Sequence, residues 1–458
     1  MNHPLTIVVF GATGDLFKKK LAKVFFDIYE KGILPIDTEV IGISRKPLTD
    51  HEWRDFIKEI LNRESFTKEQ EEFFSKFFYL PGDIKDAETF KKLSKRLGER
   101  DEKIKKCSNK LFYLAVFPAL YQELFEMISH SGLAIPCAPG FEQTEGWIKI
   151  LVEKPFGENA TEAKKLDLLL GTLFLEDQIF RVDHYLAKET IQNLLVFRFA
   201  NPLFEALWCS KHIKSVSVKM FEEHSVKERG SFYDKIGALK DVGQNHLLSL
   251  LSLVAMEMPK EFSAEAIRSQ REKVLSKIKV KDGAIRAQYD GYKEESGVEE
   301  NSETETYFKA NLKVDNKRWN DVDFIIEHGK GFSKTEASIE ITYFENIPGE
   351  LFMGTPNKLI FEIQPKEKIE IEFSAKKPGF GFEIEKQYMQ FHYKEDAVSP
   401  FIYPYEKLFL DALAGDQTLF VSTGEMKEAW RIVSDVEENM KRSDLKFYTK
   451  GIDKENIE

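Results

Sequence analysis

The chain of 458 residues contains little cysteine, and it lacks the features of an exported or membrane-anchored protein. Its three cysteines, Cys107, Cys137 and Cys209, are an odd number, and their spacing fits neither a disulfide framework nor a CxxC metal site. The amino terminus has no basic region or small-residue cleavage site, and its apolar run is too short for a signal peptide or a membrane span. We therefore expect reduced thiols, a cytoplasmic protein and no membrane partner.

Positive charge is also scarce, because the formal net charge is −11. An anionic substrate then meets general repulsion and must be captured by a local basic pocket, and nucleic acid is a poor candidate partner. The nine histidines form no HxxxH or HExxH pattern, so we expect no metal site.

What is present is the composition of a soluble globular protein, with 42% hydrophobic and 31% charged residues. The length favours two domains. In the first half, short apolar runs at 5–10, 39–44, 111–116 and 147–153 alternate with helical patterns, including one at 18–31 and one at 50–61 capped by Thr49. This alternation predicts a doubly wound α/β domain with a parallel sheet over residues 1–180.

The pattern changes in residues 181–458. A long helical stretch at 233–258 precedes strand-like runs at 306–314, 322–329, 337–344, 358–365 and 369–373, and helical patterns at 405–415 and 423–442 close the chain. Successive strands of this kind predict an α+β domain with a large, mostly antiparallel sheet and helices on one face. The polar tract at 291–305 is typical of an exposed loop.

The motif GATGDLF at 11–17 follows the first predicted strand and opens a helix. Glycines at such a turn allow close approach of a pyrophosphate, and the helix amino terminus offers N–H groups and a favourable dipole. The alternative is a plain strand-to-helix turn. The second strand ends in Arg45 and Lys46, where a cation favours a ribose 2′-phosphate and hence NADP. For Lys46 we favour a solvated basic turn.

Two further motifs carry cations. Lys154, in VEKPFG, ends another predicted strand, at the edge where such sheets bind ligands, although a lone lysine there is more often simply exposed. RVDHYLAKE at 181–189 supplies His184, Tyr185 and Lys188, which together suit a phosphate. The alternative makes Asp183 a helix cap and His184 a surface residue.

The motif DVGQNH at 241–246 offers a histidine that can accept a hydroxyl proton if a carboxylate orients it. On an ideal α-helix Asp241 is turned about 140° from His246, which makes Asp183 the preferred partner. The alternative is a polar patch that faces the core.

These motifs, in this order and continued by RGSFYD at 229–234, EHGKGF at 327–332, EIQP at 362–365 and EAWRI at 428–432, resemble the glucose-6-phosphate dehydrogenase family over essentially the whole chain. The resemblance implies a Rossmann domain joined to an α+β domain whose sheet forms a dimer interface, in a dimer or a dimer of dimers. It also implies oxidation of glucose 6-phosphate at C1 to 6-phospho-D-glucono-1,5-lactone with NADP⁺, the first step of the pentose phosphate pathway.

Residue by residue, the resemblance implies His246 as the general base and Asp183 as the carboxylate that orients it. The implied substrate-binding residues are Lys154, His184, Tyr185, Lys188, Glu222, Asp241, Lys330 and Gln364. The implied cofactor-binding residues are Gly11, Thr13, Gly14, Asp15, Leu16, Arg45, Asp83, Tyr121 and Lys154.

The chain departs from the family pattern at Phe17, Ala187, Gly243 and Thr335. Phe17 replaces a small residue at the turn, and Ala187 replaces a glycine, which requires a negative φ. Gly243 weakens a helix by roughly 1 kcal/mol relative to alanine. Thr335 replaces a cation near the substrate. Glutamates at 327, 336 and 340 replace basic residues that hold a second, structural NADP in some members, so we expect that site to be absent.

Two other functions compete with this one. A catalytically silent sugar-phosphate or NADP sensor on the same fold is expected to lose the base or its carboxylate, yet Asp183 and His246 are both present. A Rossmann oxidoreductase for unphosphorylated sugars has no need of the cluster at 184–188.

Overall fold

The structure is a computed structural model, and it describes residues 3–137, 146–345, 356–393, 402–454 and 457. The chain forms two compact units. Unit 1 consists of Met1–His184 and Tyr403–Thr423, and unit 2 consists of Tyr185–Ile402 and Gly424–Glu458. The sequence-based division at residue 180 assigns 403–423 to the second domain, whereas packing joins this segment to unit 1.

Unit 1 is built on a sheet whose strand order is β16-β6-β5-β4-β1-β2-β3. The strands are β1 (Leu5–Phe10), β2 (Thr38–Ser44), β3 (Phe77–Pro81), β4 (Asn109–Leu114), β5 (Ile148–Val152), β6 (Ile179–Val182) and β16 (Phe420–Val421). All neighbours are parallel except β16, which runs antiparallel to β6. The order 3-2-1-4-5-6 within it is that of a dinucleotide-binding Rossmann sheet, which confirms the predicted fold of this half.

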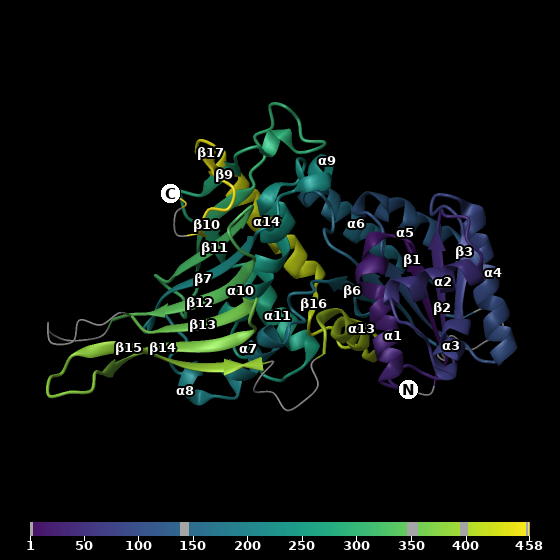
Figure 1. Cartoon of the computed structure of the whole chain (residues 1–458), viewed down its shortest axis with the longest axis horizontal. Coiled ribbons are helices and arrows are strands. Elements are labelled where there is room, and N and C mark those ends of the chain that lie inside the picture. Colours follow the sequence, from purple (N-terminus) through teal and green to yellow (C-terminus); the bar gives the residue numbers. More distant parts are fainter. Residues whose placement is uncertain (1–2, 138–145, 346–355, 394–401, 455–456, 458) are drawn as a thin grey trace. The chain divides into compact units, whose positions relative to one another are not determined.

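Helices flank this sheet (Figure 1). They are η1 (Phe17–Leu21), α1 (Ala22–Glu30), α2 (Asp50–Leu61), α3 (Lys68–Ser75), α4 (Ala87–Ile104), η2 (Pro118–Leu120), α5 (Tyr121–His130), α6 (Ala160–Leu173), η3 (Glu176–Gln178) and α13 (Pro404–Ala414). The predicted cap of α2 is confirmed, because the Thr49 hydroxyl accepts from the Glu52 N–H in a capping box.

The aromatic side chains of Phe17 and Trp53 pack against each other next to the glycine turn. Phe17 is fully buried and packs on Trp53, with ring centroids 5.6 Å apart. The Trp53 indole N–H donates to the Ala12 carbonyl at 3.2 Å, and its ring lies against Gly42, where a Cβ atom would fall 2.3 Å from Trp53 Cζ2. The bulk of Phe17 is therefore accommodated together with Trp53, and Gly42 leaves room for the indole.

The expectation of reduced thiols is wrong for two of the three cysteines. Cys107 and Cys137 form a disulfide with their Cα atoms 5.5 Å apart, and Cys209 is free. The spacing gives no hint, because it is the tertiary fold that brings Cys107, two residues before β4, next to Cys137 in the loop after α5. Lys110 ties the same loop to the sheet, since its ammonium donates to Asp101 at 2.8 Å and to the Pro136 carbonyl at 2.7 Å.

Unit 2 contains a ten-stranded sheet in the order β15-β14-β13-β12-β7-β11-β10-β9-β17, with β8 paired to β10. The strands are β7 (Ile213–Glu222), β8 (Ile278–Val280), β9 (Ile285–Tyr289), β10 (Tyr307–Val314), β11 (Asp323–Lys330), β12 (Glu336–Tyr343), β13 (Lys358–Gln364), β14 (Lys368–Lys376), β15 (Ile384–His392) and β17 (Lys446–Tyr448). Among the described strands of this sheet, only β11·β7 and β17·β9 pair in parallel, so the predicted mostly antiparallel sheet is confirmed.

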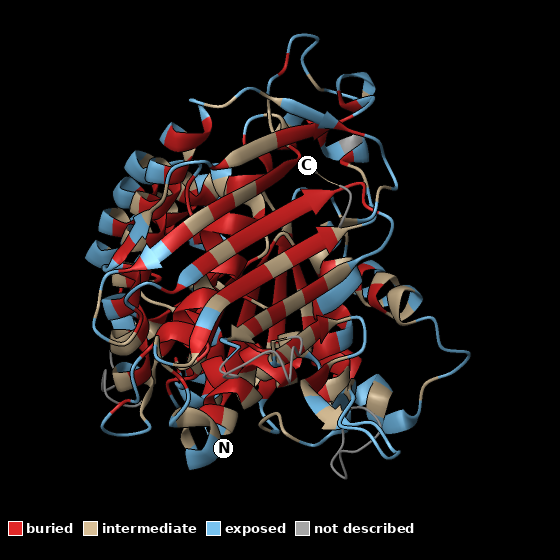
Figure 2. Cartoon of the chain, turned by 90° about the vertical axis from the view of Figure 1, so that its left-hand side faces the viewer, coloured by how far each residue is buried: buried red, intermediate tan, exposed pale blue. Residues whose placement is uncertain are grey.

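The helices of unit 2 lie behind this sheet in Figure 2, and the strands in its middle are largely buried. They are α7 (Glu189–Phe199), α8 (Pro202–Glu205), η4 (Lys227–Arg229), α9 (Gly230–Tyr233), η5 (Leu239–Leu247), α10 (Leu248–Ala255), α11 (Ala264–Leu275), η6 (Tyr292–Glu294) and α14 (Thr423–Met440). Within the described residues, no helix has both the length and the apolar character needed to cross a bilayer.

Two predictions for unit 2 need correction. The stretch 233–258 is not one α-helix, because η5 is a π-helix that continues directly into α10. Gly243 lies in η5 against Phe308, where a Cβ atom would come within 2.8 Å of the ring. The tract 291–305 is not simply exposed, since Tyr292 and Ser302 are buried.

Gly42→Ala provides a test of the packing below the glycine turn. Because the added methyl group overlaps Trp53, we expect the free energy of unfolding of unit 1 to fall by about 1–3 kcal/mol, measured as a lower midpoint of thermal unfolding. Gly98→Ala, on an open position of α4, is the control and should raise stability slightly. Equal midpoints for both variants would contradict this account.

Candidate active site

The glycine turn lies at the carboxyl end of β1. Gly11 has φ +89°, and a Cβ atom there would fall 2.2 Å from the Ala115 carbonyl oxygen, so only glycine fits. The N–H groups of Gly11 and Gly14 are used within the turn, at 2.9 Å to Ile43 O and to Gly11 O. The Thr13 and Ser44 hydroxyls are 2.6 Å apart, which joins the turn to the end of β2.

The residues around this turn suit the phosphates of a dinucleotide. Asp15 and Leu16 start the helix that continues as η1, and Asp15 forms an exposed ion pair with Lys19. Arg45 follows β2, is exposed, and makes no ion pair in the part of the chain that the structure describes. Its guanidinium is therefore available to a 2′-phosphate.

Lys154 follows β5, between a cis proline bond and the buried Glu153. Burial raises the pKa of Glu153 to about 7, against the lowering effect of the hydrogen bond from the Tyr113 hydroxyl at 2.7 Å. Tyr121 is fully buried, and its hydroxyl donates to the Glu153 carbonyl at 2.8 Å. Tyr121 thus fixes the backbone that presents Lys154. Asp83 follows β3, and its carboxylate accepts from the Lys85 N–H.

The end of β6 explains the arginine in RVDHYLAKE, to which the sequence assigned no role. Arg181 is buried and donates to Asp167 at 2.7 Å, to Thr423 at 2.9 Å and to Glu176 at 3.1 Å. It therefore anchors β6 to α6 and to the segment 403–423. That segment also brings Tyr405, whose ring stacks on His184 with centroids 5.7 Å apart. Asp183 is almost fully buried.

Unit 2 brings three motifs together that are distant in the sequence. The Tyr185 ring lies against the buried His246 imidazole, with centroids 4.3 Å apart. The Tyr185 hydroxyl donates to Gln364 at 2.9 Å, and the Lys188 ammonium lies 4.8 Å from the Tyr185 ring centroid. Lys188 is also the residue before α7, where the helix dipole favours an anion.

A second group surrounds the Lys330 ammonium at the end of β11. Lys330 is buried, and its Nζ lies 2.6 Å from Glu222 and 3.2 Å from Asp241. Burial favours the neutral forms, but the opposite charges outweigh it: the pKa of Lys330 is raised and that of Glu222 is lowered. Both groups are therefore held ionised.

The neighbours of this group are uncharged. Burial and the Lys330 charge lower the pKa of His328 to about 4, so its neutral imidazole donates from Nδ1 to the Met220 carbonyl at 2.8 Å. Thr335, which replaces a cation of the family, accepts from the Glu223 N–H at 3.1 Å. It fixes the backbone after β7 and carries no charge.

The π-helical form of η5 changes the expected geometry of Asp241 and His246. The predicted angle of about 140° assumed α-helical periodicity, whereas a π-helix bonds residue i to residue i+5 and so aligns residues five apart. The predicted angle is therefore wrong, because the sequence pattern here indicates a helix without distinguishing a π-helix from an α-helix.

The comparisons with known proteins agree with this arrangement. Residues 8–193 match the family model "Glucose-6-phosphate dehydrogenase, NAD binding domain", and residues 195–456 match "Glucose-6-phosphate dehydrogenase, C-terminal domain". The chain belongs to the glucose-6-phosphate dehydrogenase family.

Named relatives and solved structures cover nearly all of the chain. Glucose-6-phosphate 1-dehydrogenase of Borreliella burgdorferi is 38% identical over 94% of this chain and 91% of its own. The cytoplasmic glucose-6-phosphate 1-dehydrogenase 5 of Arabidopsis thaliana is 36% identical over 96% and 87%. A solved glucose-6-phosphate dehydrogenase in complex with glucose 6-phosphate superposes with a TM-score of 0.90 at 31% identity, over 99% of this chain and 95% of the other.

Sequence reasoning missed several residues that support the site. Arg181 acts from a buried position, the half-buried Tyr405 stacks on His184, and Tyr448 donates from β17 to the Lys330 carbonyl at 2.6 Å. For Arg181 a signal was present, because an arginine inside an apolar strand needs a buried acid. For Tyr405 and Tyr448, which lie far along the chain, no local pattern pointed to the site.

Arg181→Met tests the anchoring role of this arginine. Removing the guanidinium leaves the buried Asp167 carboxylate with the Thr423 hydroxyl but without its cation, so we expect a loss of roughly 3–5 kcal/mol in the stability of unit 1, measured by thermal unfolding. Lys95→Met removes an exposed pair with Glu99 and should change little. The anchoring role is refuted if Arg181→Met unfolds at the same midpoint as the control.

Proposed function

We propose that this chain oxidises glucose 6-phosphate at C1 to 6-phospho-D-glucono-1,5-lactone, with His246 as the general base and Asp183 as the carboxylate that orients it. The observation that carries the proposal is the cluster of His246, Tyr185, Gln364 and Lys188, which unites a candidate base with hydroxyl, amide and cationic groups. The family supplies the reaction, in which hydride passes to NADP⁺.

The proton transfer follows from the chemistry of the imidazole. His246, neutral before reaction, accepts the proton of the C1 hydroxyl as the C1 carbonyl forms. A carboxylate bonded to the other ring nitrogen fixes the tautomer and stabilises the imidazolium. We assign this task to Asp183, which is buried and whose neighbour His184 is held by the stacked Tyr405.

The substrate groups divide by charge. We assign the phosphate to His184, Tyr185 and Lys188, because the ammonium and the start of α7 both favour an anion. We assign the sugar hydroxyls to Glu222, Asp241, Lys330 and Gln364, since ionised carboxylates accept and the ammonium donates hydrogen bonds. Lys154 lies after β5 and is assigned to the boundary between substrate and cofactor.

Unit 1 fits the dinucleotide. When bound, NADP⁺ would supply the acceptor for the hydride that leaves C1 of the sugar. The proposed binding residues are Gly11, Thr13, Gly14, Asp15 and Leu16 at the turn, Arg45 for the 2′-phosphate, and Asp83, Tyr121 and Lys154 nearby. The tight turn at Gly11 and the exposed guanidinium of Arg45 support this set.

A cytoplasmic location is proposed from named relatives, such as the cytoplasmic enzymes 5 and 6 of Arabidopsis thaliana. The disulfide between Cys107 and Cys137 is unusual for that compartment. We propose a homodimer through the face of the large sheet that lies toward the viewer in Figure 2, because helices cover the opposite face and the family uses this sheet for assembly.

The reaction is tested by following NADPH absorbance with the purified protein and glucose 6-phosphate. We expect turnover in wild type and a loss of about 10²–10⁴-fold in kcat for His246→Asn, because the general base is removed. His51→Asn, at an exposed residue of α2, is the matched control and should match wild type. Absence of turnover in wild type, or most of it retained in His246→Asn, refutes the mechanism; a parallel assay with NAD⁺ measures the preference for NADP⁺.

The dimer is tested by molar mass from light scattering. Glu340 pairs with Lys358 at 2.6 Å on adjacent strands of the sheet. Glu340→Lys places like charges side by side at the proposed interface, so we expect a shift of mass from dimer to monomer. Glu99→Lys on α4 serves as control, and a monomeric wild type would rule the proposal out.

A further inference from the structure

Glu305 connects the polar tract before β10 with the helix that carries Asp241 and His246. Its carboxylate Oε1 accepts from the N–H of Leu239, the first residue of η5, at 3.0 Å. Its backbone carbonyl accepts from the Ala238 N–H at 3.0 Å. The first N–H groups of a helix have no partner inside the helix, so Glu305 caps η5 from a distant segment.

Gly237 makes room for this cap. It has φ +72°, and a Cβ atom there would lie 2.4 Å from Glu305 Oε1 and 2.6 Å from Oε2. The carboxylate therefore rests directly on the Gly237 backbone, and any side chain at 237 displaces it. Gly237 and Glu305 therefore form one structural unit, although 68 positions separate them in the sequence. Neither residue belongs to the motifs that identify the family.

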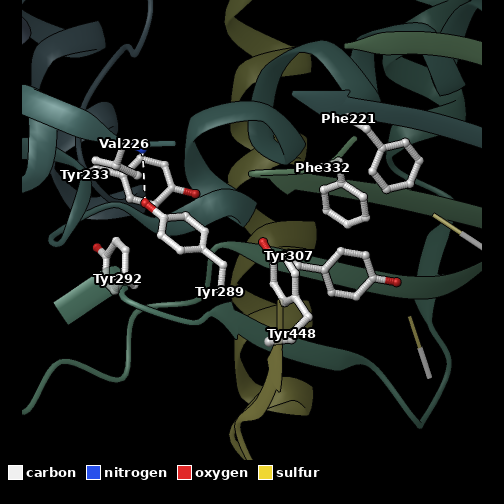
Figure 3. Close-up of a cluster of buried hydrophobic side chains, with 9 residues drawn as sticks. Phe221, Val226, Tyr233, Tyr289, Tyr292, Tyr307, Phe332 and Tyr448 are labelled. Atoms are coloured by element: carbon white, nitrogen blue, oxygen red, sulfur yellow. Dashed lines mark hydrogen bonds between the residues drawn. The ribbon is translucent and has the colours of Figure 1, made fainter. Parts of the chain in front are cut away.

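The next residue, Thr306, holds the other side of the site. Its carbonyl accepts from the Lys330 N–H at 3.0 Å, and its hydroxyl lies 2.9 Å from the Tyr448 hydroxyl, which donates to the Lys330 carbonyl at 2.6 Å. In Figure 3, Tyr448 and Tyr307 lie beside Phe332 in an aromatic cluster, and the ring centroids of Tyr448 and Phe332 are 5.4 Å apart. Glu305 is thus hydrogen-bonded to the start of η5, and Thr306 is hydrogen-bonded to the end of β11.

η5 and β11 are also in contact through their candidate site residues, because Lys330 Nζ lies 3.2 Å from the Asp241 carboxylate. A closed ring results, which runs from Glu305 through η5 to Asp241, across to Lys330 and back through Thr306. Rigid closed networks of this kind fix side chains within the narrow range that catalysis requires.

We propose that Glu305, seated on Gly237, is a positioning residue of the active site that sets η5, and with it Asp241 and His246, relative to Lys330. The inference rests on the proposed function of these residues. Glu305 touches neither substrate nor cofactor in this assignment, and it acts by accepting the Leu239 N–H.

The groups that face Glu305 are Lys240 on η5, Glu437 on α14, and Tyr233 and Tyr292. Lys240 and Glu437 pair with each other at 3.1 Å. Burial raises the pKa of Glu305 to about 7, which exceeds its value in the unfolded chain. The folded state therefore holds this proton more tightly, and stability from this group falls as pH rises from about 4.5 to 7.

Four variants test the proposal with glucose 6-phosphate and NADP⁺ as substrates. Glu305→Ala removes the acceptor, and we expect kcat over KM for glucose 6-phosphate to fall about 10–100-fold, while the KM for NADP⁺ stays unchanged because unit 1 supplies that site. Glu305→Gln keeps an acceptor oxygen and should restore kcat over KM to within about threefold of wild type. It should also remove the loss of stability between pH 5 and 7.

Gly237→Ala provides an independent arm, since it displaces the carboxylate and should reproduce the loss seen in Glu305→Ala. The double variant Gly237→Ala, Glu305→Ala should lose less than the sum of the two single losses, because the clash with the carboxylate is gone and only the strain of alanine at a positive φ is added. NADP⁺ binding by fluorescence reports folding of each variant.

The outcomes separate the two claims. If wild type shows no NADPH formation with glucose 6-phosphate, the proposed function fails before the variants are compared. If wild type is active and Glu305→Ala keeps its kcat over KM, or Glu305→Gln is as impaired as Glu305→Ala, the positioning role of Glu305 is refuted and the function stands.

Discussion

The buried ammonium of Lys330 between Glu222 and Asp241 is the interaction on which the substrate half of the chain depends. It joins β11, β7 and η5 at one point. Burying the Lys330 ammonium beside two partly exposed carboxylates is expensive, and apolar replacements of such buried groups are often equally stable or more so. Stability alone therefore does not account for the charges. A polar ligand with several hydroxyl groups does, because two carboxylates and an ammonium can bind donors and acceptors together.

The same reasoning separates sugar from phosphate in the assignment. Two carboxylates beside Lys330 repel an anion, whereas Lys188 at the start of α7 attracts one. In a chain of net charge −11, that local contrast is what distinguishes one end of the substrate from the other. The neutral His328 next to Lys330 adds no positive charge, so the carboxylates dominate there.

The sequence predicted the features that repeat locally, and it missed those that depend on tertiary contact. The alternation of strands and helices predicted the parallel sheet, and the motif GATGDLF predicted the glycine turn that follows β1. The return of 403–423 to unit 1 was missed, because β16 has only two residues and pairs antiparallel at an edge. The disulfide was missed because only the tertiary fold brings Cys107 and Cys137 together across 30 positions. The buried part of the tract 291–305 was missed because its acidic composition predicts exposure.

The departures from the family pattern show how such partners compensate a change. Phe17 is matched by Trp53, which itself needs Gly42, and Gly243 is matched by Phe308. Ala187 is fully buried, and its φ is not positive, so the condition for a methyl group there is met. Each of these changes alters packing, where a neighbour can adjust.

Thr335 differs from the other three, because its hydroxyl is engaged by the Glu223 N–H and no shift of a neighbour restores a charge. The cation nearest to Thr335 in the sequence, Lys334, forms an ion pair with Glu336 at 3.2 Å. In our assignment the substrate is then held by fewer fixed cations than the family pattern implies, at either its phosphate or its sugar. In this assignment the remaining substrate-binding groups contribute a larger share of the affinity. A displacement of His184 or Lys188 then weakens substrate binding more than it would beside an additional cation.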